Sequence, residues 1–509
     1  MKSHFIGIDI GTSSARAVLF DNNGFQVSID SQEYSLNVSI AGMAELNPNQ
    51  VFDSVINVLR NCIKKSGIDK KFISGMGLSC QMHSLMLVDN SGAPMSGLIT
   101  WADTRAKAEA DAINDVYNVS DLYNRTGCRI QHPMYPLSKL LWLKKDNPEL
   151  FTKCYKFITI KEYIIFKLYG EYVVDYTLAS CQGYYNIHSQ NWDNHILNDI
   201  IGITAEKLSE VVECTFILKG FKTEFESILG IYKDTPLVVG AGDGIMANIG
   251  CGVVDNSSFS STVGTSGAIR TASEKPLLDV NQKTWCYSFL NDMWVSGGAI
   301  NNGGLVLKWF RDEFNNQFEQ EARLHNISIY QLFDSYASEI NPGSDGLIFL
   351  PFLTGERSPG WKADARGIMY GLSYSHGRKH MLRASMEGIM FRLYAVYEVI
   401  SRLNNSATCI IANGGYTKSD IWLQMQVDIF NKEIAVSRVT EASALGAAYL
   451  AMYALGEVKD IKKVLPGMHT EKVMLPSEEN HLIYKKAYEL SNQIYESIFS
   501  GIKSMHSAN

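Results

Sequence analysis

Long apolar runs, paired cysteines and a secretory signal are all missing from this sequence of 509 residues. No run approaches the roughly 20 apolar residues that a membrane-spanning helix needs. The first ten residues, MKSHFIGIDI, lead directly into an expected strand without a small-residue cleavage site. The nine cysteines are scattered without a C-x-x-C pair, so the sequence suggests neither a disulfide framework nor a zinc site. We therefore expect a globular cytoplasmic protein.

An excess of positive charge is missing as well. The formal net charge is −7, whereas nucleic-acid-binding domains usually carry a basic surface. The expected partner is a small molecule, neither a nucleic acid nor a membrane, and the sequence leaves open whether the chain forms a homodimer. Because 509 residues are too many for one hydrophobic core and low-complexity linkers are absent, we expect two packed domains with a cleft between them.

Both common nucleotide-binding fingerprints are absent from the glycine loop near the N-terminus. GIDIGTSSARAVLF (residues 7–20) contains neither G-x-x-x-x-G-K-[ST] nor a G-x-G-x-x-G that opens a helix. A second apolar segment follows the loop, then a DNNG turn at 21–24 and FQVSI at 25–29. This pattern predicts a hairpin, with Asp9, Gly11, Thr12 and Ser13 around its bend.

The same pattern occurs a second time, in SSFSSTVGTSGAIR at residues 257–270. The repeat suggests duplicated α/β domains, each with a hydroxyl-rich glycine bend that faces a shared cleft. We place these domains at residues 1–246 and 247–455, followed by a helical tail at 456–509. Further strands are expected at 75–78, 86–89, 236–240, 409–412 and 433–437, and helices at 107–117 and 421–430. The small residues of EASALGAAYLAMYALG (441–456) predict a helix that packs closely on a sheet.

Two aspartates at expected strand ends are candidates for phosphoryl-transfer chemistry. A buried Asp9 carboxylate would need a cation or hydrogen-bond donors, and a magnesium ion that carries nucleotide phosphates would supply the cation. Asp243, in GAGDGIMANIG, is flanked by glycines, which leave space for a substrate hydroxyl to reach a general base. The alternatives are an ordinary strand-end turn for Asp9 and an N-cap role for Asp243.

Polar and aromatic residues near two further strand ends predict a sugar site. CQMHSLMLVDN (80–90) and ITWADTR (99–105) contribute Gln81, His83, Trp101, Asp103 and Arg105. Amide, imidazole, carboxylate and guanidinium groups beside an indole suit a polyhydroxylated ligand, because each hydroxyl both donates and accepts hydrogen bonds. A single histidine or tryptophan would more often be structural, so the prediction depends on the clustering.

Glycine bends and a charged segment in the second half allow more than one interpretation. Gly297–Gly298, Gly303–Gly304 and Gly414–Gly415 could let a base or ribose approach the backbone. Glu356, Arg357 and Arg366 in GERSPGWKADARG are either charges of a cleft or a surface ion pair.

Taken in order, these motifs resemble the FGGY family of carbohydrate kinases, which belongs to the superfamily of sugar kinases, actin and heat-shock chaperone ATPases. The similarity extends over nearly the whole chain: GIDIGTSSARAVLF, GLSCQMHSLMLVD, TWADTR, GAGDG, VGTSGAIR, GGAINNGGLVLKWFRDE, GERSP, NGGYTKSDIWLQM and EASALGAAYLA. The resemblance implies two duplicated actin-like (ribonuclease H-like) α/β domains with an inter-domain cleft, ATP as co-substrate and Mg²⁺ as cofactor.

The resemblance also implies roles for individual residues. Asp9 would help to hold the magnesium ion, and Asp243 would be the catalytic base. Residues implied at the nucleotide, with Thr265 approaching the γ-phosphoryl group, are Gly11, Thr12, Ser13, Arg16, Gly264, Thr265, Gly298, Gly303, Gly414 and Gly415. Those implied at the sugar are Gln81, Met82, His83, Trp101, Asp103, Arg105 and His132.

Within the family, three segments are most similar to gluconokinases: TGCRIQHPMYPLSKLLWL, VDYTLAS and GGAINNGGLVLKWFRDEF. Gluconate carries a carboxylate, and His83, Arg105, Arg129 and His132 are cations or potential cations near the expected sugar site. We therefore expect ATP-dependent conversion of gluconate to 6-phosphogluconate. Xylulokinases share the Gln-Met-His and Trp-x-Asp-x-Arg elements, so xylulose or another sugar is the alternative substrate. An actin-like module that only changes shape with nucleotide would not need the cluster from Gln81 to Arg105.

Overall fold

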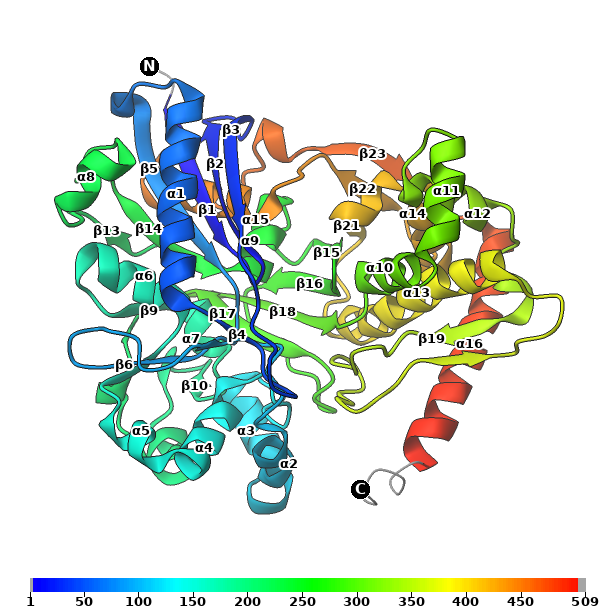
Figure 1. Cartoon of the computed structure of the whole chain (residues 1–509), viewed down its shortest axis with the longest axis horizontal. Helices are drawn as coiled ribbons and strands as arrows, with labels where there is room; N and C mark the ends of the chain where they lie inside the picture. The colour runs from blue at the N-terminus through cyan, green and yellow to red at the C-terminus, as the bar shows by residue number, and fades with distance from the viewer. Residues whose placement is uncertain (1–2, 502–509) are drawn as a thin grey trace. The chain divides into compact units, whose positions relative to one another are not determined.

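The computed structural model describes residues 3–501, except for the side chains of residues 315–317, 500 and 501. The chain forms two compact units. The first comprises Met1–Asn256, Thr271–Ser296 and Glu441–His469, and the second comprises Ser257–Arg270, Gly297–Thr440 and Thr470–Asn509. Each unit contains a mixed sheet with helices (Figure 1). The expected two-domain α/β class is confirmed, whereas the domain boundaries and the cleft stay predictions.

The first unit is built on a six-stranded sheet with the order β13-β14-β5-β1-β2-β3. Its strands are β1 (His4–Ile10), β2 (Ser14–Asp21), β3 (Gln26–Glu33), β5 (Ile73–Cys80), β13 (Ile217–Leu218) and β14 (Leu237–Gly242). Strands β1 and β2 form the expected antiparallel hairpin. Because β5 runs parallel to both β1 and β14, the carboxyl ends of these three strands meet at one edge of the sheet.

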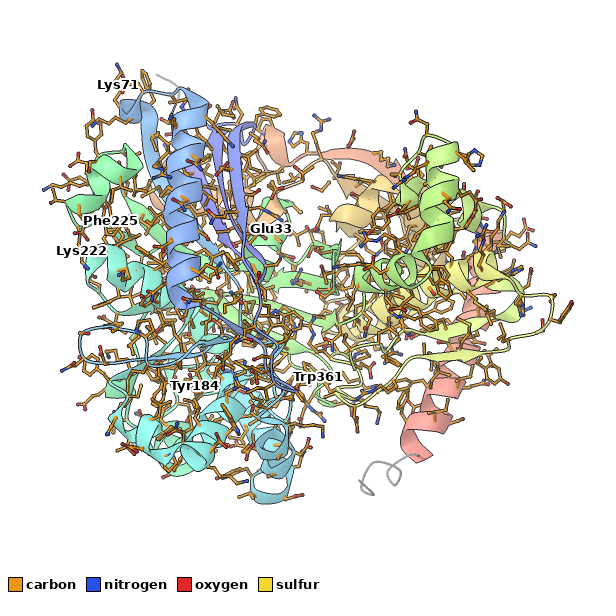
Figure 2. All side chains as sticks on the ribbon, viewed as in Figure 1. Glu33, Lys71, Tyr184, Lys222, Phe225 and Trp361 are labelled. Carbon is orange, nitrogen blue, oxygen red and sulfur yellow. The ribbon has the colours of Figure 1, made fainter. Side chains whose placement is uncertain are left out.

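Helices cover the two faces of this sheet. Helix α15 (Ala442–Ala454) packs on β1, β5 and β14, and α1 (Pro48–Ser66) packs on β2 and β3. A Cβ on Gly7 or Gly77 would lie only 1.8 or 2.1 Å from a carbonyl oxygen of α15, so glycine in the strands and small residues in the helix permit the close contact. On the other face, Phe225 (labelled in Figure 2) packs edge-on against Phe52 of α1, with ring centroids 5.9 Å apart.

A group of shorter elements between β5 and β14 carries other residues of interest in the first unit. They include β6 (Met86–Val88), α2 (Lys107–Val116), α3 (Val119–Thr126), α4 (Pro136–Asp146), α5 (Pro148–Lys153), α6 (Ile160–Tyr169), α7 (Tyr176–Ser180) and α8 (Glu224–Leu229). Helix α9 (Asp243–Gly250) follows β14 directly, and β17 (Trp285–Leu290) also belongs to this unit.

The second unit repeats the strand arrangement of the first. In its sheet, β16 (Gly267–Ser273), β15 (Ser258–Val263), β21 (Cys409–Asn413), β22 (Ile434–Ser437) and β23 (Thr470–Met474) lie side by side in this order. Strand β15 pairs antiparallel with β16 and parallel with β21, as β1 pairs with β2 and β5. The predicted duplication of the hairpin bend is therefore confirmed.

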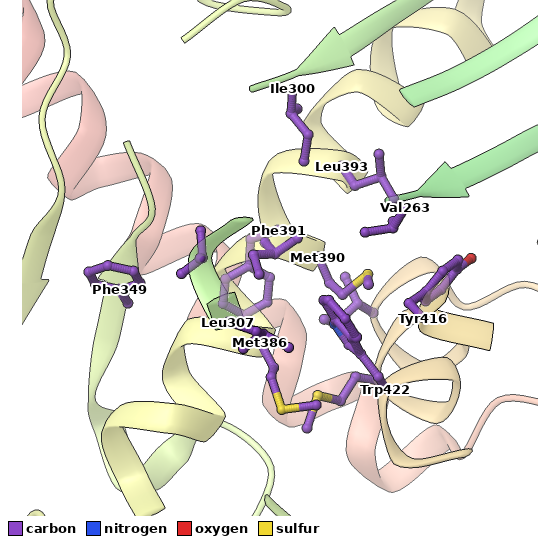
Figure 3. Packing of buried hydrophobic residues seen from close by; sticks show 14 of the residues in the cluster. Val263, Ile300, Leu307, Phe349, Met386, Met390, Phe391, Leu393, Tyr416 and Trp422 are labelled. Carbon is purple, nitrogen blue, oxygen red and sulfur yellow. The ribbon is translucent and has the colours of Figure 1, made fainter. Parts of the chain in front are cut away.

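The core of the second unit surrounds the long helix α13 (Arg378–Leu403). Met386, Met390, Phe391 and Leu393 of this helix are buried with Val263 at the end of β15 (Figure 3). Other helices of the unit are α10 (Gly304–Glu313), α11 (Asn315–Leu324), α12 (Ile329–Ser338), α14 (Asp420–Phe430) and α16 (Glu478–Gly501). The packing keeps the bend after Val263 attached to a dense apolar core.

Residues 456–509, for which we predicted a helical tail, also contain a strand. Strand β23 pairs antiparallel with β22 at the edge of the sheet, and only two of its five residues are partly buried. The predicted helix is present in α16, up to the end of the described residues. Among residues 3–501, no helix is long and apolar enough to cross a membrane.

Candidate active site

Two carboxylates lie at the carboxyl edge of the first sheet. Asp9 is the penultimate residue of β1, and Asp243 begins α9 immediately after β14. Ser79 of β5 lies opposite Asp9, and its Oγ donates a hydrogen bond of 2.8 Å to Asp9 Oδ1. Burial, and next the charge of Asp243, raise the pKa of Asp9 to about 7. The two carboxylates are therefore close enough to affect each other electrostatically.

The charges around Asp9 fit a magnesium ion that is held mainly by ligands from outside the protein. No group of three His, Cys, Asp or Glu side chains suited to a metal occurs within the described part of the chain. Mg²⁺ does not require such a group, since it commonly binds one or two carboxylates together with water and phosphate oxygens. A cation beside Asp9 would also stabilise the ionised form that burial disfavours.

Arg16 and Glu441 lie near this carboxylate pair. Arg16 is opposite Asp9 in the β1–β2 register, and its Nη1 is 3.1 Å from Glu441 Oε2. The charge of Arg16 lowers the pKa of Asp9 and the charge of Glu441 raises it. Arg16, predicted at the nucleotide, is thus partly balanced by a carboxylate that the sequence reasoning missed.

Asp243 does not cap α9. The N-cap position belongs to Gly242, which has no side-chain capping bond, and Asp243 Oδ1 accepts a 2.7 Å hydrogen bond from the adjacent Gly244 N–H. Met82 packs against Gly242, where a Cβ would lie 2.7 Å from Met82 Cγ. The N-cap interpretation is therefore wrong, and Asp243 is placed beside a residue that we predicted at the sugar.

Hydrogen bonds join the first glycine bend to the predicted sugar residues. Trp101 Nε1 donates to Thr12 Oγ1 at 3.0 Å, and Thr12 Oγ1 donates to Gln81 Oε1 at 3.2 Å. Gln81 Nε2 donates in turn to the Gly11 carbonyl oxygen at 3.1 Å. Ser13 is exposed at the same bend. The structure thus brings together two predicted groups that lie about 70 to 90 residues apart in the chain.

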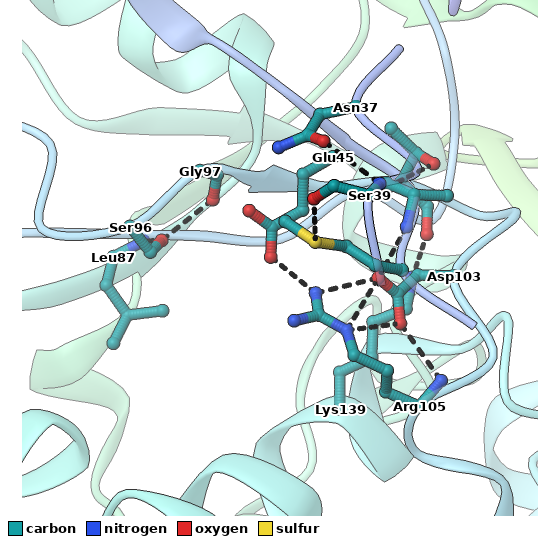
Figure 4. A network of polar contacts seen from close by, with 12 residues as sticks. Asn37, Ser39, Glu45, Leu87, Ser96, Gly97, Asp103, Arg105 and Lys139 are labelled. Atoms are coloured by element: carbon teal, nitrogen blue, oxygen red, sulfur yellow. Dashed lines mark hydrogen bonds and ion pairs between the residues drawn. The ribbon is translucent and has the colours of Figure 1, made fainter. Parts of the chain in front are cut away.

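Arg105 is held by two carboxylates (Figure 4). Its Nη2 lies 2.7 Å from Asp103 Oδ2 and also pairs with Glu45. The guanidinium stacks over the ring of Trp142, 4.7 Å from its centroid. Asp103 Oδ2 also accepts a hydrogen bond of 2.9 Å from Ala44 N–H. The positive charge of Arg105 is therefore balanced within the protein, which leaves no excess for a substrate carboxylate.

Both the backbone carbonyl and the ring of His83 form hydrogen bonds. Buried Lys139 of α4 donates hydrogen bonds of 2.7 Å to the carbonyl oxygens of His83 and Thr100, and burial lowers the pKa of this lysine to about 7. His83 has φ 63°, which is uncommon for a residue with a side chain. Its Nε2 lies 2.9 Å from the Tyr287 hydroxyl. Lys139 therefore fixes an unusual backbone conformation at the predicted sugar residues.

His132 is buried in the loop between α3 and α4, where its Nδ1 accepts a 3.2 Å hydrogen bond from Met134 N–H. This bond gives the ring a local structural partner. A contact between His132 and the sugar stays a prediction.

The predicted nucleotide residues of the second unit gather at the end of β15. The N–H groups of Gly303 and Gly304 donate to the carbonyl oxygens of Thr265 (3.1 Å) and Gly264 (2.7 Å), so α10 begins against the bend. Gly414, with φ 99°, packs against Val263, where a Cβ would lie 2.6 Å from the Val263 carbonyl oxygen.

Two other glycines of this unit differ in their surroundings. A Cβ on Gly415 would meet nothing within 4 Å, so this position is open. A Cβ on Gly298 would instead lie 2.6 Å from Val396 and 2.8 Å from Ser358. Packing alone explains glycine at 298, and its predicted place beside the nucleotide stays a prediction.

The charged segment around Glu356 does not form a surface ion pair. Glu356 is buried, pairs with Arg392 of α13 and accepts a hydrogen bond of 2.7 Å from the Tyr495 hydroxyl. The surface interpretation is therefore wrong for Glu356, which joins α13 to α16 inside the second unit.

Two family models match the chain in succession. The N-terminal domain of the FGGY family of carbohydrate kinases matches residues 4–250, and the C-terminal domain of the same family matches residues 259–455. The chain belongs to the FGGY family of carbohydrate kinases. This membership confirms the predicted family and identifies the protein as a carbohydrate kinase.

Three relatives show the range of sugars associated with similar FGGY kinases. A gluconokinase of Bacillus subtilis (strain 168) is 41% identical over 466 residues, which cover 91% of this chain and 90% of that protein. A crystal structure of gluconate kinase from Lactobacillus acidophilus is 34% identical, with a TM-score of 0.90 and 98% of each chain covered. A crystal structure of ligand-bound xylulose kinase from Lactobacillus acidophilus is also 34% identical, with a TM-score of 0.90, covering 97% of this chain and 98% of that chain.

A buried polar network positions the segment of this FGGY kinase that carries Asp243. The Gly242 N–H donates to Thr177 Oγ1 at 2.6 Å, and Thr177 Oγ1 donates to Asp175 Oδ1 at 2.5 Å. The other oxygen of Asp175 lies 2.6 Å from Lys161 Nζ, which also donates to the Val239 carbonyl oxygen at 3.1 Å. The network therefore binds β14 at two points just before Asp243.

Thr177→Val is expected to lower both turnover and stability. Valine keeps the shape but leaves the buried Gly242 N–H without an acceptor, which costs about 1–3 kcal/mol. We expect a melting temperature lower by a few degrees and a reduced kcat, because Asp243 follows Gly242. Thr177→Ser keeps the hydroxyl and is the matched control. Equal kcat and melting temperature for the valine and serine variants would show that the hydrogen bond does not position Asp243.

Several residues of this site were missed by the sequence reasoning, and their signals differ. Lys139 and Lys161 stand in the apolar segments PLSKLLWL and ITIKEYIIF, where a lone lysine is a sign of a buried, paired cation. Glu441 and Thr177 gave no comparable signal, because their contacts depend on elements distant in the chain.

Proposed function

We propose that this protein is an ATP-dependent gluconokinase that converts gluconate to 6-phosphogluconate with Mg²⁺. The observation that carries the proposal is the pair of coupled carboxylates, Asp9 and Asp243, at a sheet edge that also holds Gln81 and Met82. Family membership supports the reaction class. The 41% identity to a gluconokinase supports the substrate, whereas the two structural relatives support gluconate and xylulose equally.

In this proposal Asp243 is the general base. Its carboxylate takes the proton from the terminal hydroxyl of the sugar as that oxygen attacks the γ-phosphorus of ATP. Met82 beside Gly242 and the hydrogen bonds from Trp101 to Thr12 and from Thr12 to Gln81 keep the lining of the sugar site in place. A preformed lining lowers the entropy lost when the hydroxyl is aligned.

In the same proposal, Asp9 is the residue that binds the magnesium ion. When bound, Mg²⁺ neutralises charge on the phosphates during transfer. Asp9 would hold the ion through its carboxylate, and the N–H groups of Thr12 and Ser13 would face phosphate oxygens. Gly11 begins this bend, where its own N–H donates to the Ser14 carbonyl oxygen at 3.0 Å. In the second unit, Gly264 and Thr265 contribute the other bend, and Gly303, Gly414 and Gly415 border the nucleotide. We further propose that the kinase acts in the cytoplasm on a small sugar substrate.

Gluconate is expected to be a better substrate than xylulose, with kcat/KM higher by roughly 10- to 100-fold. In the proposed site a partly buried cation pairs with the carboxylate of gluconate. A neutral sugar has no carboxylate, so the cation is left without its partner when such a sugar binds. The measurement is coupled ADP release with gluconate, xylulose, glycerol and ribulose at saturating Mg-ATP. An equal or higher kcat/KM for xylulose would make the protein a xylulokinase, and ADP release unaffected by any sugar would indicate a nucleotide switch instead.

A further inference from the structure

Arg129 is a shielded cation that forms no ion pair among the described residues. It lies in the loop between α3 and α4, and its side chain is half-buried. Its Nη1 donates to Gln282 Oε1 at 3.5 Å, and its buried Nε has no hydrogen-bond partner within residues 3–501. Burial lowers the pKa of Arg129, and the groups that oppose this effect are tyrosines, Tyr135 and Tyr123. Because a guanidinium stays protonated in proteins, Arg129 carries a positive charge that a bound anion would stabilise.

The other arginines of the first unit do not share this situation. Arg16 pairs with Glu441, Arg105 pairs with Asp103 and Glu45, and Arg125 pairs with Asp121 and Asp193. Arg60 is exposed on α1, where water solvates its charge. Arg129 is therefore the arginine of this unit that is shielded from water without a carboxylate beside it in the described chain.

A buried amide in the same loop also lacks partners. Both Gln131 Oε1 and Gln131 Nε2 are buried and form no hydrogen bond to any residue that the structure describes. Buried polar groups without partners are rare in native proteins. Two such groups, separated by one residue, indicate that this loop is completed by a polar ligand that both accepts and donates hydrogen bonds.

The loop is connected to the predicted sugar residues through Tyr135. The backbone of Arg129 hydrogen-bonds with the Tyr135 side chain, and the Tyr135 ring packs edge-on against the His83 ring, with centroids 5.3 Å apart. The hydroxyl of Tyr287 lies 3.4 Å from the Tyr135 hydroxyl and 2.9 Å from His83 Nε2. Arg129 is therefore connected to His83 through Tyr135.

We propose that Arg129 binds the carboxylate of a sugar-acid substrate, with Gln131 as a second polar contact, and so determines the preference for an aldonic acid over a neutral sugar. This inference rests on the proposed gluconokinase function. A guanidinium can pair with a carboxylate through two parallel hydrogen bonds. The phosphorylated hydroxyl of gluconate lies at the opposite end of the molecule from its carboxylate. Arg129 therefore acts as a specificity residue, whereas Asp9 and Asp243 act at the reacting end.

The test compares sugar acids with neutral sugars in Arg129→Gln protein. Gluconate, other aldonic acids, their reduced polyols and xylulose are assayed by ADP release at saturating Mg-ATP. We expect kcat/KM for gluconate to fall roughly 10²- to 10³-fold, mainly through KM, while kcat/KM for the neutral sugars changes little. Arg129→Lys keeps the charge and is expected to recover part of the loss. Arg60→Gln removes an exposed arginine of the same unit and should leave every KM unchanged.

The outcomes separate this inference from the proposed function. If the unmodified kinase prefers gluconate and Arg129→Gln keeps that preference, the role of Arg129 is overturned and the function stands. If the unmodified kinase prefers a different aldonic acid and Arg129→Gln loses the preference for that acid, the role of Arg129 is supported and the gluconate assignment is wrong. If the unmodified kinase prefers no acid over the corresponding polyol, both the proposed function and the role of Arg129 are overturned. If Arg129→Gln lowers kcat/KM equally for acids and neutral sugars, the role of Arg129 alone is overturned. Arg129→Met replaces the glutamine variant if the latter does not fold.

Discussion

Asp243→Asn protein is expected to phosphorylate gluconate roughly 10² to 10⁴ times more slowly than the unchanged kinase, which is the usual contribution of a general base. Asparagine keeps the size of the side chain and can still accept the 2.7 Å hydrogen bond from Gly244 N–H, but it cannot take the proton of the sugar hydroxyl. The measurement is kcat at saturating gluconate and Mg-ATP. KM for ATP should change little, since the substitution does not alter the two glycine bends that are proposed to contact the nucleotide.

The structure makes this test sharper than the sequence did. An N-cap role would have let asparagine replace aspartate at little cost, but the cap position belongs to Gly242. A melting temperature close to that of the unchanged kinase is expected, and Asp115→Asn on the exposed face of α2 controls for the loss of one negative charge. A folded variant that keeps more than about a tenth of normal turnover would remove Asp243 from the role of base.

Most of the fold could be predicted because its signals are local. The apolar segment, bend and apolar segment at residues 4–21 and again at 258–273 specify two hairpins, and the small residues of α15 predict close packing on glycines of β1 and β5. Strand β23 was missed because only two of its five residues are partly buried. Such an edge strand has a weak alternation of apolar and polar residues.

Some members of the candidate site were expected from the sequence, whereas their pairings were not. Gln81 and Trp101 were recognised as polar groups near strand ends, yet the bond through Thr12 depends on how β1 and β5 align. Arg105 and Arg129 were equivalent in the sequence, where both were potential partners of a carboxylate. Only the fold brings Asp103 and Glu45 to Arg105 and leaves Arg129 without a carboxylate in the described chain.

Asp9→Asn is expected to reduce Mg²⁺-dependent turnover by roughly 10²-fold or more, because metal stabilisation of developing charge contributes several kcal/mol. The half-saturating Mg²⁺ concentration should rise as well, since an amide oxygen is a weaker ligand than a carboxylate. The measurement is a Mg²⁺ titration of ADP release at saturating gluconate. Unchanged Mg²⁺ dependence would contradict the placement of Asp9 at the metal.

The same substitution is expected to stabilise the ligand-free protein at pH 8. Burial and Asp243 raise the pKa of Asp9 from 3.8 to about 7, so the folded state binds a proton between about pH 4 and pH 7 that the unfolded state has already lost. The contribution of Asp9 to stability is therefore fully present below pH 4, falls as the pH rises to 7 and stays low above it. Asparagine does not titrate and avoids this loss. The difference in melting temperature between variant and unchanged kinase should thus grow from pH 5 to pH 8.

Adding Mg-ATP should reverse the order of stability, because at a given concentration a ligand stabilises the folded state more when it binds that state more tightly. The unchanged kinase, whose ionised Asp9 meets the cation, should gain more in melting temperature at pH 8 than Asp9→Asn. Ser79→Ala is the matched control, since it removes the 2.8 Å hydrogen bond to Asp9 Oδ1 but keeps the carboxylate. A variant that is less stable than the unchanged kinase at every pH, with or without Mg-ATP, would make Asp9 a structural residue rather than a residue reserved for the metal.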